Sequence, residues 1–535
     1  FAIEVQHLQV RFVATAGGAT SGARAQTTFT DEWLVGVFLA PGSLTSAGAG
    51  GTATFNVEVL MGPGTGPPCL MRLSVVSGLP PGATSTTQLW NVDATFTAQV
   101  QVTTAPGTAP GAYGIVIQAD QLTPCDPPPD GLPSYNQLFT TLGVTAAKTW
   151  YGGTGPWDLT FNWDPFGVPT PGEIVVINHG NATLPAGSVS VRDLVINAGG
   201  SVSMPNASTL EITGNWRNSG AFNATAGRVI FNGTGSANTT FAGTNQFHDV
   251  EIREDPNFDV AAGALIKVGG NWLNNQSGLS LDDHPTTVEF NGSSGIQIIT
   301  GNANFYHVIV SGAAPVQVFL PQSLAGDLTV TGTSLELFNT MNRVTAGGTL
   351  TIGDGATLKL GGANSFPANF ATHVLSPTST VEYNGFGVNQ LVSPETYGNL
   401  LIAATGTKTI PAGTTVAGNA TMKFGAVVLA TGGITVDGNW NLATSASFNP
   451  GAFTHLLRGN LIRDASVWTS TGTLVLDGAT GQTLTAANAT PFGNLTVNND
   501  AGVTLVGDQA VSGDLLLENG VVTTGASTLS ALGTV

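Results

Sequence analysis

Apolar and polar residues alternate in short runs along most of the chain, which is the pattern of β-strands and not of amphipathic helices. Between residues 27 and 147 four such runs stand out, namely TATFNVEVL, CLMRLSVV, TFTAQVQVTT and AYGIVIQA. The stretches between them, such as SGLPPGAT and APGTAPGAYG, contain the glycine and proline typical of turns. The pattern predicts a domain of β-strands over residues 27–147.

Beyond residue 175 the pattern becomes repetitive. One motif recurs as VIFNGTG from Val229, VEFNGSSG from Val288, VEYNGFG from Val381 and LVLDGATG from Leu474, with spacings of 59, 93 and 93 residues. Each copy is followed 16 to 18 residues later by an aromatic residue and another strand pattern. A third signature is Gly-Asn or Gly-Asp ahead of an apolar residue. Recurring strand signatures without helices between them indicate a solenoid.

In a solenoid each turn buries its apolar face against the next turn, so that parallel strands stack in register around one core. The spacing of 93 residues is interpreted as about five turns, and residues 148–535 as about 19 turns. With neighbouring strands ~4.8 Å apart, the rod would be roughly 90 Å long. The predicted fold is therefore all-β, with the N-terminal domain followed by a cap at 148–175 and a right-handed parallel β-solenoid at 176–535.

Tryptophans cluster in TWYGGTGPWDLTFNWDPFGVP, residues 149–169, where the repeats are about to begin. The first turn of a solenoid has a bare face, and an uncovered sheet edge invites aggregation. Large apolar side chains at this point are expected to cover that face. The predicted cap residues are Trp150, Trp157 and Trp163.

Three further tryptophans follow the recurring Gly-Asn dipeptide: Trp216, Trp272 and Trp440. They could form an exposed ladder on which sugars stack, or they could fill an inward slot. The corresponding positions of other repeats hold Leu328, Leu461, Leu515 and Ala420. Because leucine and alanine offer no aromatic face, we expect the slot to belong to the core.

Residues 1–26 form a separate segment. Its apolar residues alternate with polar ones and change phase midway: Ile3, Val5, Leu8, Val10 and Phe12. The pattern predicts a strand, and the following GGATSGARA predicts a flexible connector. The strand could belong to the sheet of its own domain, or it could insert into a neighbouring subunit.

The N-terminal domain resembles bacterial immunoglobulin-like domains. The resemblance rests on Gly78-Leu79-Pro80-Pro81-Gly82-Ala83 and on Pro110-Gly111-Ala112-Tyr113 ahead of a strand. It implies an immunoglobulin-like β-sandwich over 27–147. Such domains are mostly spacers, so the resemblance implies little about chemistry.

The tryptophan-rich stretch resembles the entry segment of β-solenoid modules in large bacterial surface and adhesin-like proteins. The matching residues are Thr149-Trp150, Gly152, Trp157, Asn162-Trp163, Pro165 and Gly167-Val168-Pro169. Together with the repeats that follow, the resemblance covers nearly all of 148–535. It implies a parallel β-helix that is secreted and displayed on the cell surface.

Composition narrows the classes of partner. The chain carries 33 acidic and 15 basic residues, for a net charge of −18, and charged residues make up only 9% of it. With so few cations no basic patch can neutralise a run of phosphates, which argues against nucleic-acid binding. Apolar runs fall short of the ~20 residues that cross a membrane, so no transmembrane segment is expected.

The chain has two cysteines, Cys69 and Cys125, each beside prolines. They could be unpaired thiols. A disulfide is favoured because the rest of the chain has the composition of a secreted protein, and secreted proteins retain disulfides.

No constellation of catalytic residues emerges from the sequence. The best carboxylate candidates are Asp282-Asp283-His284 and the pair Asp255 and Asp259, and the interpretation favoured for the first group is a solvated loop. His248 and His307 lie near equivalent repeat strands one register apart, so they predict no metal pair. We expect no enzyme activity, no metal and no cofactor.

These observations favour a structural extracellular protein, either a subunit of a cell-surface filament or an adhesin stalk. Its main partner would be copies of itself, joined head-to-tail by the N-terminal strand, with surface glycans or the cell envelope as further partners. The alternative is a β-helix that binds or degrades polysaccharides, such as a lyase, a hydrolase or a tailspike-like protein. A cluster of carboxylates with Arg or Lys on one face would favour the alternative, and the sequence shows none.

Overall fold

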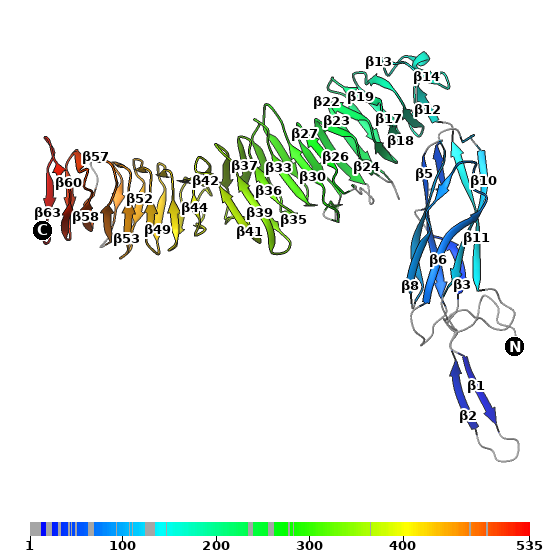
Figure 1. The fold of residues 1–535 in the computed structure, drawn as a ribbon, viewed down its shortest axis with the longest axis horizontal. Coiled ribbons are helices and arrows are strands. Elements are labelled where there is room, and N and C mark those ends of the chain that lie inside the picture. Colours follow the sequence, from blue (N-terminus) through cyan, green and yellow to red (C-terminus); the bar gives the residue numbers. More distant parts are fainter. Residues whose placement is uncertain are drawn as a thin grey trace.

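The structure is a computed structural model. It describes residues 12–17, 24–29, 34–40, 43, 45–48, 51–61, 69–92, 94–105, 108–109, 111–122, 134–145, 147–233, 239–254, 260, 262–276, 279–281, 283–363, 365–469, 472–487 and 490–535. The described part is all-β apart from one short 3-10 helix, η2 (Thr160–Asn162). It divides into an N-terminal region of antiparallel sheets and a long parallel β-solenoid (Figure 1).

The chain begins with a two-stranded antiparallel hairpin of β1 (Phe12–Gly17) and β2 (Arg24–Phe29). Arg24 and Ala25 of the predicted flexible connector are therefore the first residues of a strand. In Figure 1 the hairpin lies at the end of the N-terminal domain that is opposite the solenoid. The part of the predicted N-terminal strand before Phe12 lies outside the described residues.

The N-terminal domain consists of two sheets around one core. Their strands are β3 (Leu34–Leu39), β5 (Thr52–Met61), β9 (Phe96–Thr103) and β7 (Thr84–Ser85) in one sheet, and β4 (Ser46–Gly48), β11 (Tyr135–Thr145), β10 (Gly111–Gln121), β6 (Cys69–Ser77) and β8 (Gln88–Val92) in the other. All pairs are antiparallel except β4 with β11. Alternate residues of both sheets, such as Phe55, Val100 and Ile117, fill the core. The alternating runs that predicted strands in this domain do form strands.

The solenoid has three faces, which successive strands visit in turn. Face 1 is one parallel sheet of 17 strands. They are β17 (Ser188–Val191), β20 (Thr209–Ile212), β23 (Arg228–Asn232), β26 (Asp249–Glu254), β28 (Trp272–Asn274), β31 (Gln297–Thr300), β34 (Val316–Val318), β37 (Ser334–Leu337), β40 (Thr357–Leu360), β42 (Thr380–Tyr383), β45 (Asn399–Ile402), β48 (Ala420–Met422), β51 (Trp440–Leu442), β54 (Leu461–Asp464), β57 (Gln482–Ala487), β59 (Val503–Val506) and β62 (Val522–Thr523). At about 4.8 Å per strand this sheet spans roughly 80 Å.

Face 2 comprises an 11-stranded and a 7-stranded sheet, one after the other along the axis. The first contains β13 (Thr154–Pro156), β16 (Gly180–Thr183), β19 (Gly200–Met204), β22 (Ala221–Ala224), β25 (Thr244–Phe247), β27 (Leu265–Val268), β30 (Thr287–Phe290), β33 (His307–Val310), β36 (Leu328–Val330), β39 (Gly347–Ile352) and β41 (Phe370–Leu375). The second contains β44 (Thr396–Tyr397), β47 (Thr414–Val416), β50 (Ile434–Val436), β53 (Thr454–Leu457), β56 (Thr473–Leu476), β58 (Asn494–Asn498) and β61 (Leu515–Asn519).

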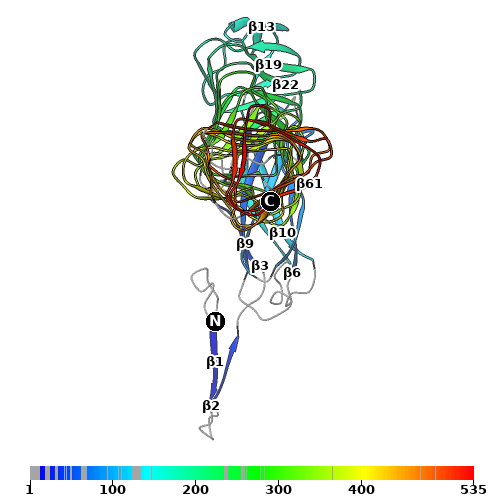
Figure 2. The ribbon, with the colours of Figure 1, turned by 90° about the vertical axis from the view of Figure 1, so that its left-hand side faces the viewer.

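Face 3 is divided into four shorter sheets. Their strands are β14 (Trp163–Asp164), β12 (Ala147–Trp150), β15 (Ile174–Ile177), β18 (Asp193–Ile196), β21 (Trp216–Asn218) and β24 (Thr239–Phe241); β29 (Leu279–Ser280), β32 (Ala303–Phe305), β35 (Gln322–Leu324) and β38 (Met341–Arg343); β43 (Gln390–Leu391), β46 (Thr407–Ile410), β49 (Val427–Ala430), β52 (Ser447–Asn449) and β55 (Val467–Trp468); and β60 (Gln509–Val511) and β63 (Leu529–Ala531). Figure 2, turned by 90° from Figure 1, shows the turns stacked behind one another.

One continuous apolar core runs from Trp150 to Leu515. It forms because alternate residues of every strand point inward and stack on the equivalent residue of the next turn. In-register pairs such as Val316 with Leu335 and Leu358 with Val381 show this stacking. The predicted single core and parallel register are confirmed.

The recurring Gly-Asn dipeptide forms a ladder of hydrogen bonds at the corner that leads into face 1. The Oδ1 atom of Asn399 accepts the backbone N–H of Asn419 at 2.9 Å, and Asn419 accepts that of Asn439 at 2.9 Å. The ladder continues through Asn460 and ends at Thr483, at 2.9 and 2.7 Å. Each rung therefore satisfies a backbone donor of the following turn.

Other ladders start in the same way from residues that follow the recurring aromatic by two positions. Asp249 accepts the N–H of Asn271, His307 that of Asp327 and Asn494 that of Asp514. The aromatic signature in the sequence therefore marks the start of a hydrogen-bond ladder.

The glycine of the dipeptide is required by the stacking. A Cβ atom on Gly438 would lie 2.2 Å from the carbonyl oxygen of Gly418, and one on Gly459 would lie 2.1 Å from that of Gly438. These glycines form a column in which each backbone touches the next. A side chain at any of them would push neighbouring turns apart.

A buried glutamine explains the Asn-Gly motif. In three copies its Oε1 accepts the N–H of the motif glycine at 2.9 to 3.0 Å, and its Nε2 donates to a carbonyl of the preceding turn. The pairs are Gly292 with Gln297, Gly385 with Gln390 and Gly478 with Gln482. The side chain thus satisfies polar groups at a corner that would otherwise be buried without partners.

The 93-residue spacing does not correspond to about five whole turns. Val229 and Val381 lie on face 1, in β23 and β42, whereas Val288 and Leu474 lie on face 2, in β30 and β56. From Val288 to Val381 the chain makes four turns and one further face. The interpretation as about five turns was wrong because a motif that marks a corner recurs here at two different corners.

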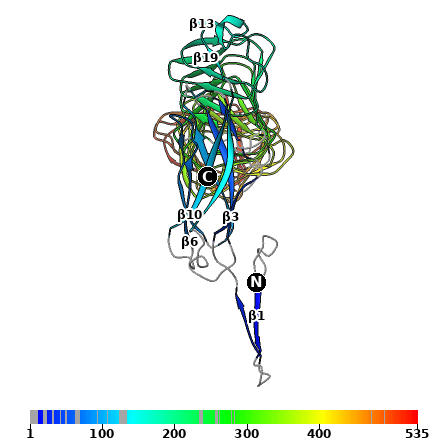
Figure 3. The same cartoon turned by 90° about the vertical axis from the view of Figure 1, so that its right-hand side faces the viewer.

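The N-terminal domain packs against the first turns of face 3. The outer side of this face carries the buried residues Ile174, Val176 and Val195, which form a small cluster of their own. A Cβ atom on Gly48 in β4 would lie 2.5 Å from the Cδ1 atom of Ile174, so the domain and the solenoid are in close contact. Figures 1 and 3 show the two parts meeting at an angle.

Candidate functional site: a groove beside the first strand of face 1

Three tryptophans close the N-terminal end of the solenoid core. Trp150, Trp157 and Trp163 are all buried. Their rings meet edge to face, with centroids 5.0 Å apart for Trp150 and Trp163 and 4.7 Å apart for Trp157 and Trp163. Two indole N–H groups donate to carbonyls, from Trp150 to Gly153 at 2.9 Å and from Trp163 to Trp157 at 2.7 Å. The structure thus places all three in the position expected of a cap.

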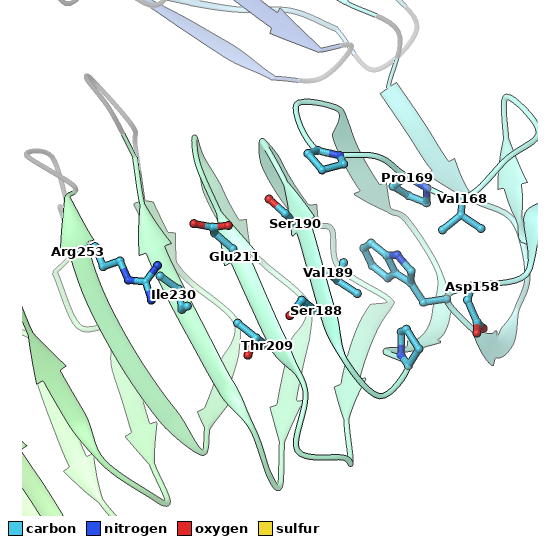
Figure 4. A pocket seen from close by; sticks show the side chains of 13 residues that line it. Asp158, Val168, Pro169, Ser188, Val189, Ser190, Thr209, Glu211, Ile230 and Arg253 are labelled. Carbon is cyan, nitrogen blue, oxygen red and sulfur yellow. The ribbon is translucent and has the colours of Figure 1, made fainter.

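The cap leaves a hollow on its face 1 side. It has a volume of about 610 Å³ and extends from the cap along β17, the first strand of face 1, and over the outer side of β20, β23 and β26. Figure 4 shows its lining as sticks, with Val168 and Pro169 on the cap side and Ser188, Val189 and Ser190 of β17 opposite. A volume of this size is typical of a ligand site.

The groove exists because the cap does not form a strand on face 1. In the first turn β12 and β14 lie on face 3 and β13 on face 2, and the first strand of face 1 is β17. Pro169, Pro171 and Pro185 line the hollow. Because proline has no N–H to donate, this wall cannot pair with β17 as an ordinary strand would.

The backbone edge of β17 faces the groove. The carbonyls of Gly187 and Val191 accept the N–H groups of Thr209 and Thr213, at 2.8 and 3.1 Å, so the odd-numbered residues bond to β20. In a parallel pair the alternate residues direct their backbone groups to the opposite side. The N–H and C=O groups of Ser188 and Ser190 therefore point toward the cap.

A charged cluster lies at the far end of the groove. Glu251 is buried, and it accepts hydrogen bonds from Arg253 at 2.6 Å and from Arg228 at 2.9 Å. Burial alone would raise the pKa of Glu251, but the hydrogen bonds and charges of the two arginines outweigh it and lower that pKa. Arg253 and Glu211 both line the groove. The groove therefore combines apolar walls, hydroxyl groups and a fixed ion cluster.

The solenoid tryptophans point inward. Trp216, Trp272 and Trp440 are buried, as are the equivalent Leu328, Leu461, Leu515 and Ala420. Trp440 packs edge to face against Phe448 and Trp468, with centroids 5.1 and 5.7 Å apart. No tryptophan of this set offers a face to a sugar.

Of the carboxylates singled out as catalytic candidates, the structure describes only Asp283. Asp283 and His284 are exposed, whereas Asp282, Asp255 and Asp259 lie outside the described residues. His248 directly precedes β26 on face 1, whereas His307 is the first residue of β33 on face 2, so their apparent equivalence in the repeats was wrong. Within the described ranges no group of three His, Cys, Asp or Glu residues could hold a metal ion.

Several predicted residues lie where the structure makes no statement. Cys125 is outside the described residues, and so are Ile3, Val5, Leu8 and Val10. Cys69 is the first residue of β6, and Phe12 is the first residue of β1. The disulfide and the donated strand therefore stay predictions.

The sequence patterns did not reveal the buried charged residues of the core. Arg463 occupies an inward position of β54 with only 1% of its surface exposed, and its guanidinium lies 4.2 Å from the ring centroid of Phe492. Burial lowers the pKa of Arg463 to about 10. Lys408 is also buried, and its Nζ donates to the carbonyls of Gly385, Val388 and Thr405 at 2.8 to 3.0 Å. Both residues occupy inward positions of an alternating pattern, which is a signal that the sequence does contain.

His455 gives the solenoid a predicted sensitivity to acid. It is buried, its Nδ1 accepts the N–H of Ile434 at 3.3 Å, and its Nε2 lies 3.0 Å from the carbonyl oxygen of Pro450. Burial lowers the pKa of His455, although the bond to Pro450 raises it slightly. As the pH falls below about 6.5, His455 therefore gains a proton in the unfolded chain before it does so in the folded protein. The free energy of unfolding decreases over this pH range.

We therefore expect the wild-type protein to lose more stability between pH 7.5 and pH 5 than His455→Gln, in which the side chain is neutral at both. Urea unfolding at the two pH values measures the difference. Equal losses in the two proteins would contradict the assignment.

Comparison with known proteins gives no family for this chain. No protein-family model and no curated protein matches it. Among the described residues no helix is long and apolar enough to cross a membrane. The function must therefore be inferred from the fold and from the groove.

Proposed function

We propose that this protein is a structural extracellular protein, a subunit of a cell-surface filament or adhesin stalk that assembles head-to-tail with copies of itself. The observation that carries the proposal is the uninterrupted core from Trp150 to Leu515, with hydrogen-bonded corner ladders between its turns. A rod built in this way holds a fixed length and direction. Those properties serve a spacer or a fibre.

The N-terminal domain fits the same role. Its two sheets around one core support the proposed immunoglobulin-like spacer domain, and its packing on Ile174 would transmit load to the rod. The low proportion of charged residues and the β-solenoid support secretion to the surface of a bacterium. Assembly would use the N-terminal strand, because an extended segment can add to a neighbour's sheet edge through main-chain hydrogen bonds.

The donor proposed here is residues 1–11. Phe12 pairs with Phe29 in the hairpin of its own chain, so it is already engaged there. A head-to-tail contact that does not close into a ring produces a filament.

Deletion tests this proposal. Negative-stain images of the full chain should show filaments, with a repeat no shorter than the roughly 80 Å of face 1. Deleting residues 1–11 leaves β1 and β2 in place, and it should give folded single rods. Deleting residues 1–16 should do the same but also remove most of β1.

Circular dichroism and thermal unfolding establish that the shortened chains fold. Filaments that persist without residues 1–11 would contradict assembly by strand donation. Isolated rods from the full chain at every concentration would contradict the filament itself.

A further inference from the structure

We propose that the exposed edge of β17 is the acceptor for an extended strand, residues 1–11 of a second copy of this chain. This inference rests on the proposed head-to-tail assembly, and it names the surface that receives the donor. It starts from the groove between the cap and β17, where no strand among the described residues pairs with the first strand of face 1.

The lining of the groove indicates a backbone edge. Ser188, Val189 and Ser190 are consecutive, yet all three line it. Since side chains alternate between the two sides of a strand, three consecutive residues can share one hollow only if the strand's edge faces it. The hydrogen bonds of Gly187 and Val191 to the next turn confirm which edge this is. An unpaired edge of this kind is a template for another strand.

The opposite wall cannot fill the position. It carries Pro169 and Pro171, which have no N–H groups, and Pro185 lies at the end nearest β17. A strand from another chain would bring the missing donors and acceptors. This is why the expected occupant is a peptide backbone and not a saccharide, which would leave the regularly spaced groups of β17 poorly matched.

The side chains of the groove suit an alternating segment. Trp157 and Val168 give it an apolar side, and Ser188 and Ser190 of β17 give it a polar side. The first residues of the chain alternate in the same sense, with Ile3 and Val5 between polar neighbours. A strand lying along β17 would place its apolar residues on one side and its polar residues on the other.

The donor must come from a second copy. The β1–β2 hairpin lies at the end of the N-terminal domain opposite the solenoid (Figure 1). The domain's strand β10 has 11 residues, which corresponds to about 37 Å of extended chain. Eleven donor residues reach at most about 40 Å. Within one chain all eleven residues would be needed to span the length of the domain, and none would remain to pair with β17.

The matched variants are Ser190→Pro and Ser190→Thr in the full chain. Proline removes the N–H that faces the groove, and it is tolerated in an edge strand where that group makes no bond within the sheet. Threonine keeps the N–H. We expect Ser190→Pro to raise the critical concentration for filament formation roughly tenfold or more, because main-chain bonds to the donor are lost. Ser190→Thr should stay within about twofold of the wild type, well under the tenfold step that 1.4 kcal/mol produces.

A second measurement does not depend on the folding of a variant. A synthetic peptide of residues 1–11, with a photo-crosslinker in place of Val5, is added to the full chain below its assembly concentration. It should label residues 168–171 or 188–190, and a scrambled peptide should label neither. Labelling at the groove supports β17 as the acceptor edge. If the full chain nevertheless forms no filaments, that result contradicts only the proposed function.

Two results would overturn the inference. One is filaments that form equally well from Ser190→Pro, together with peptide labels elsewhere, which would leave the filament proposal standing. The other is protection of the groove by an oligosaccharide mixture while the peptide fails to label it, which would make the groove a glycan site.

Discussion

Trp440→Ala is expected to lower the free energy of unfolding by about 3–5 kcal/mol, because it leaves a cavity in a core that cannot collapse around it. The indole is buried between Phe448 of β52 and Trp468 of β55, which belong to two successive turns. Both neighbours are held by the stacking of their own turns. Urea unfolding, and hydrogen exchange of the turns around β51, measure the loss.

Two control variants test whether the loss of stability comes from the lost volume of a buried side chain. Trp440→Phe keeps a ring and removes an indole N–H that has no partner among the described residues, so it should cost much less than the alanine variant. Trp90→Ala removes a tryptophan that is 40% exposed in the N-terminal domain, and it should cost less than about 1 kcal/mol. An alanine variant at 440 that unfolds like the wild type but no longer binds glycans would favour the sugar ladder.

Gly438→Ala is expected to destabilise the solenoid by about 1–3 kcal/mol or more, as overpacking does. The new methyl group would lie 2.2 Å from the carbonyl oxygen of Gly418, so two turns must separate. Their separation would lengthen the ladder bond from the N–H of Asn439 to Asn419. Thermal unfolding measures the effect.

Gly269→Ala is the matched control, since the nearest atoms to its added methyl group are 3.5 Å away. Its stability should equal that of the wild type or exceed it slightly, because alanine restricts the unfolded chain. A similar loss in both variants would show that the glycine column is not the cause.

The sequence predicted those features that follow from a single strand or a single slot. A position that holds Trp440 in one repeat and Leu461 or Ala420 in others must be inward and apolar, and all three are buried. Alternation of apolar and polar residues predicted the strands because each strand carries this pattern by itself, and the recurring signatures predicted that they stack in parallel around one core. Neither inference needs knowledge of how the turns are arranged.

Features that depend on the corner between two strands were not predicted. The motif around Val288 and Val381 looks alike in sequence but lies on different faces, because the corner and not the face is what repeats. Gln390 was missed although a glutamine follows the motif glycine by four or five residues in three copies. Its role needs a partner on the preceding turn, which the sequence does not identify.

The groove illustrates the same limit. Trp157 signalled a cap, but the sequence does not tell which of three faces the cap leaves without a strand. Only the order of strands shows that face 1 begins at β17. The exposed edge therefore follows from a topology, and not from any residue pattern in Ser188 to Val191.

The corner ladder has a mechanical consequence. Its bonds join one turn to the next, so they run along the axis, and a pull along the rod stretches the rungs of Asn399, Asn419 and Asn439 at the same time as the sheet bonds beside them. Amides carry no net charge, so dissolved ions do not screen these bonds as they screen ion pairs. The contribution of this ladder to the tensile stiffness of the rod should accordingly be the same in fresh water and in brine.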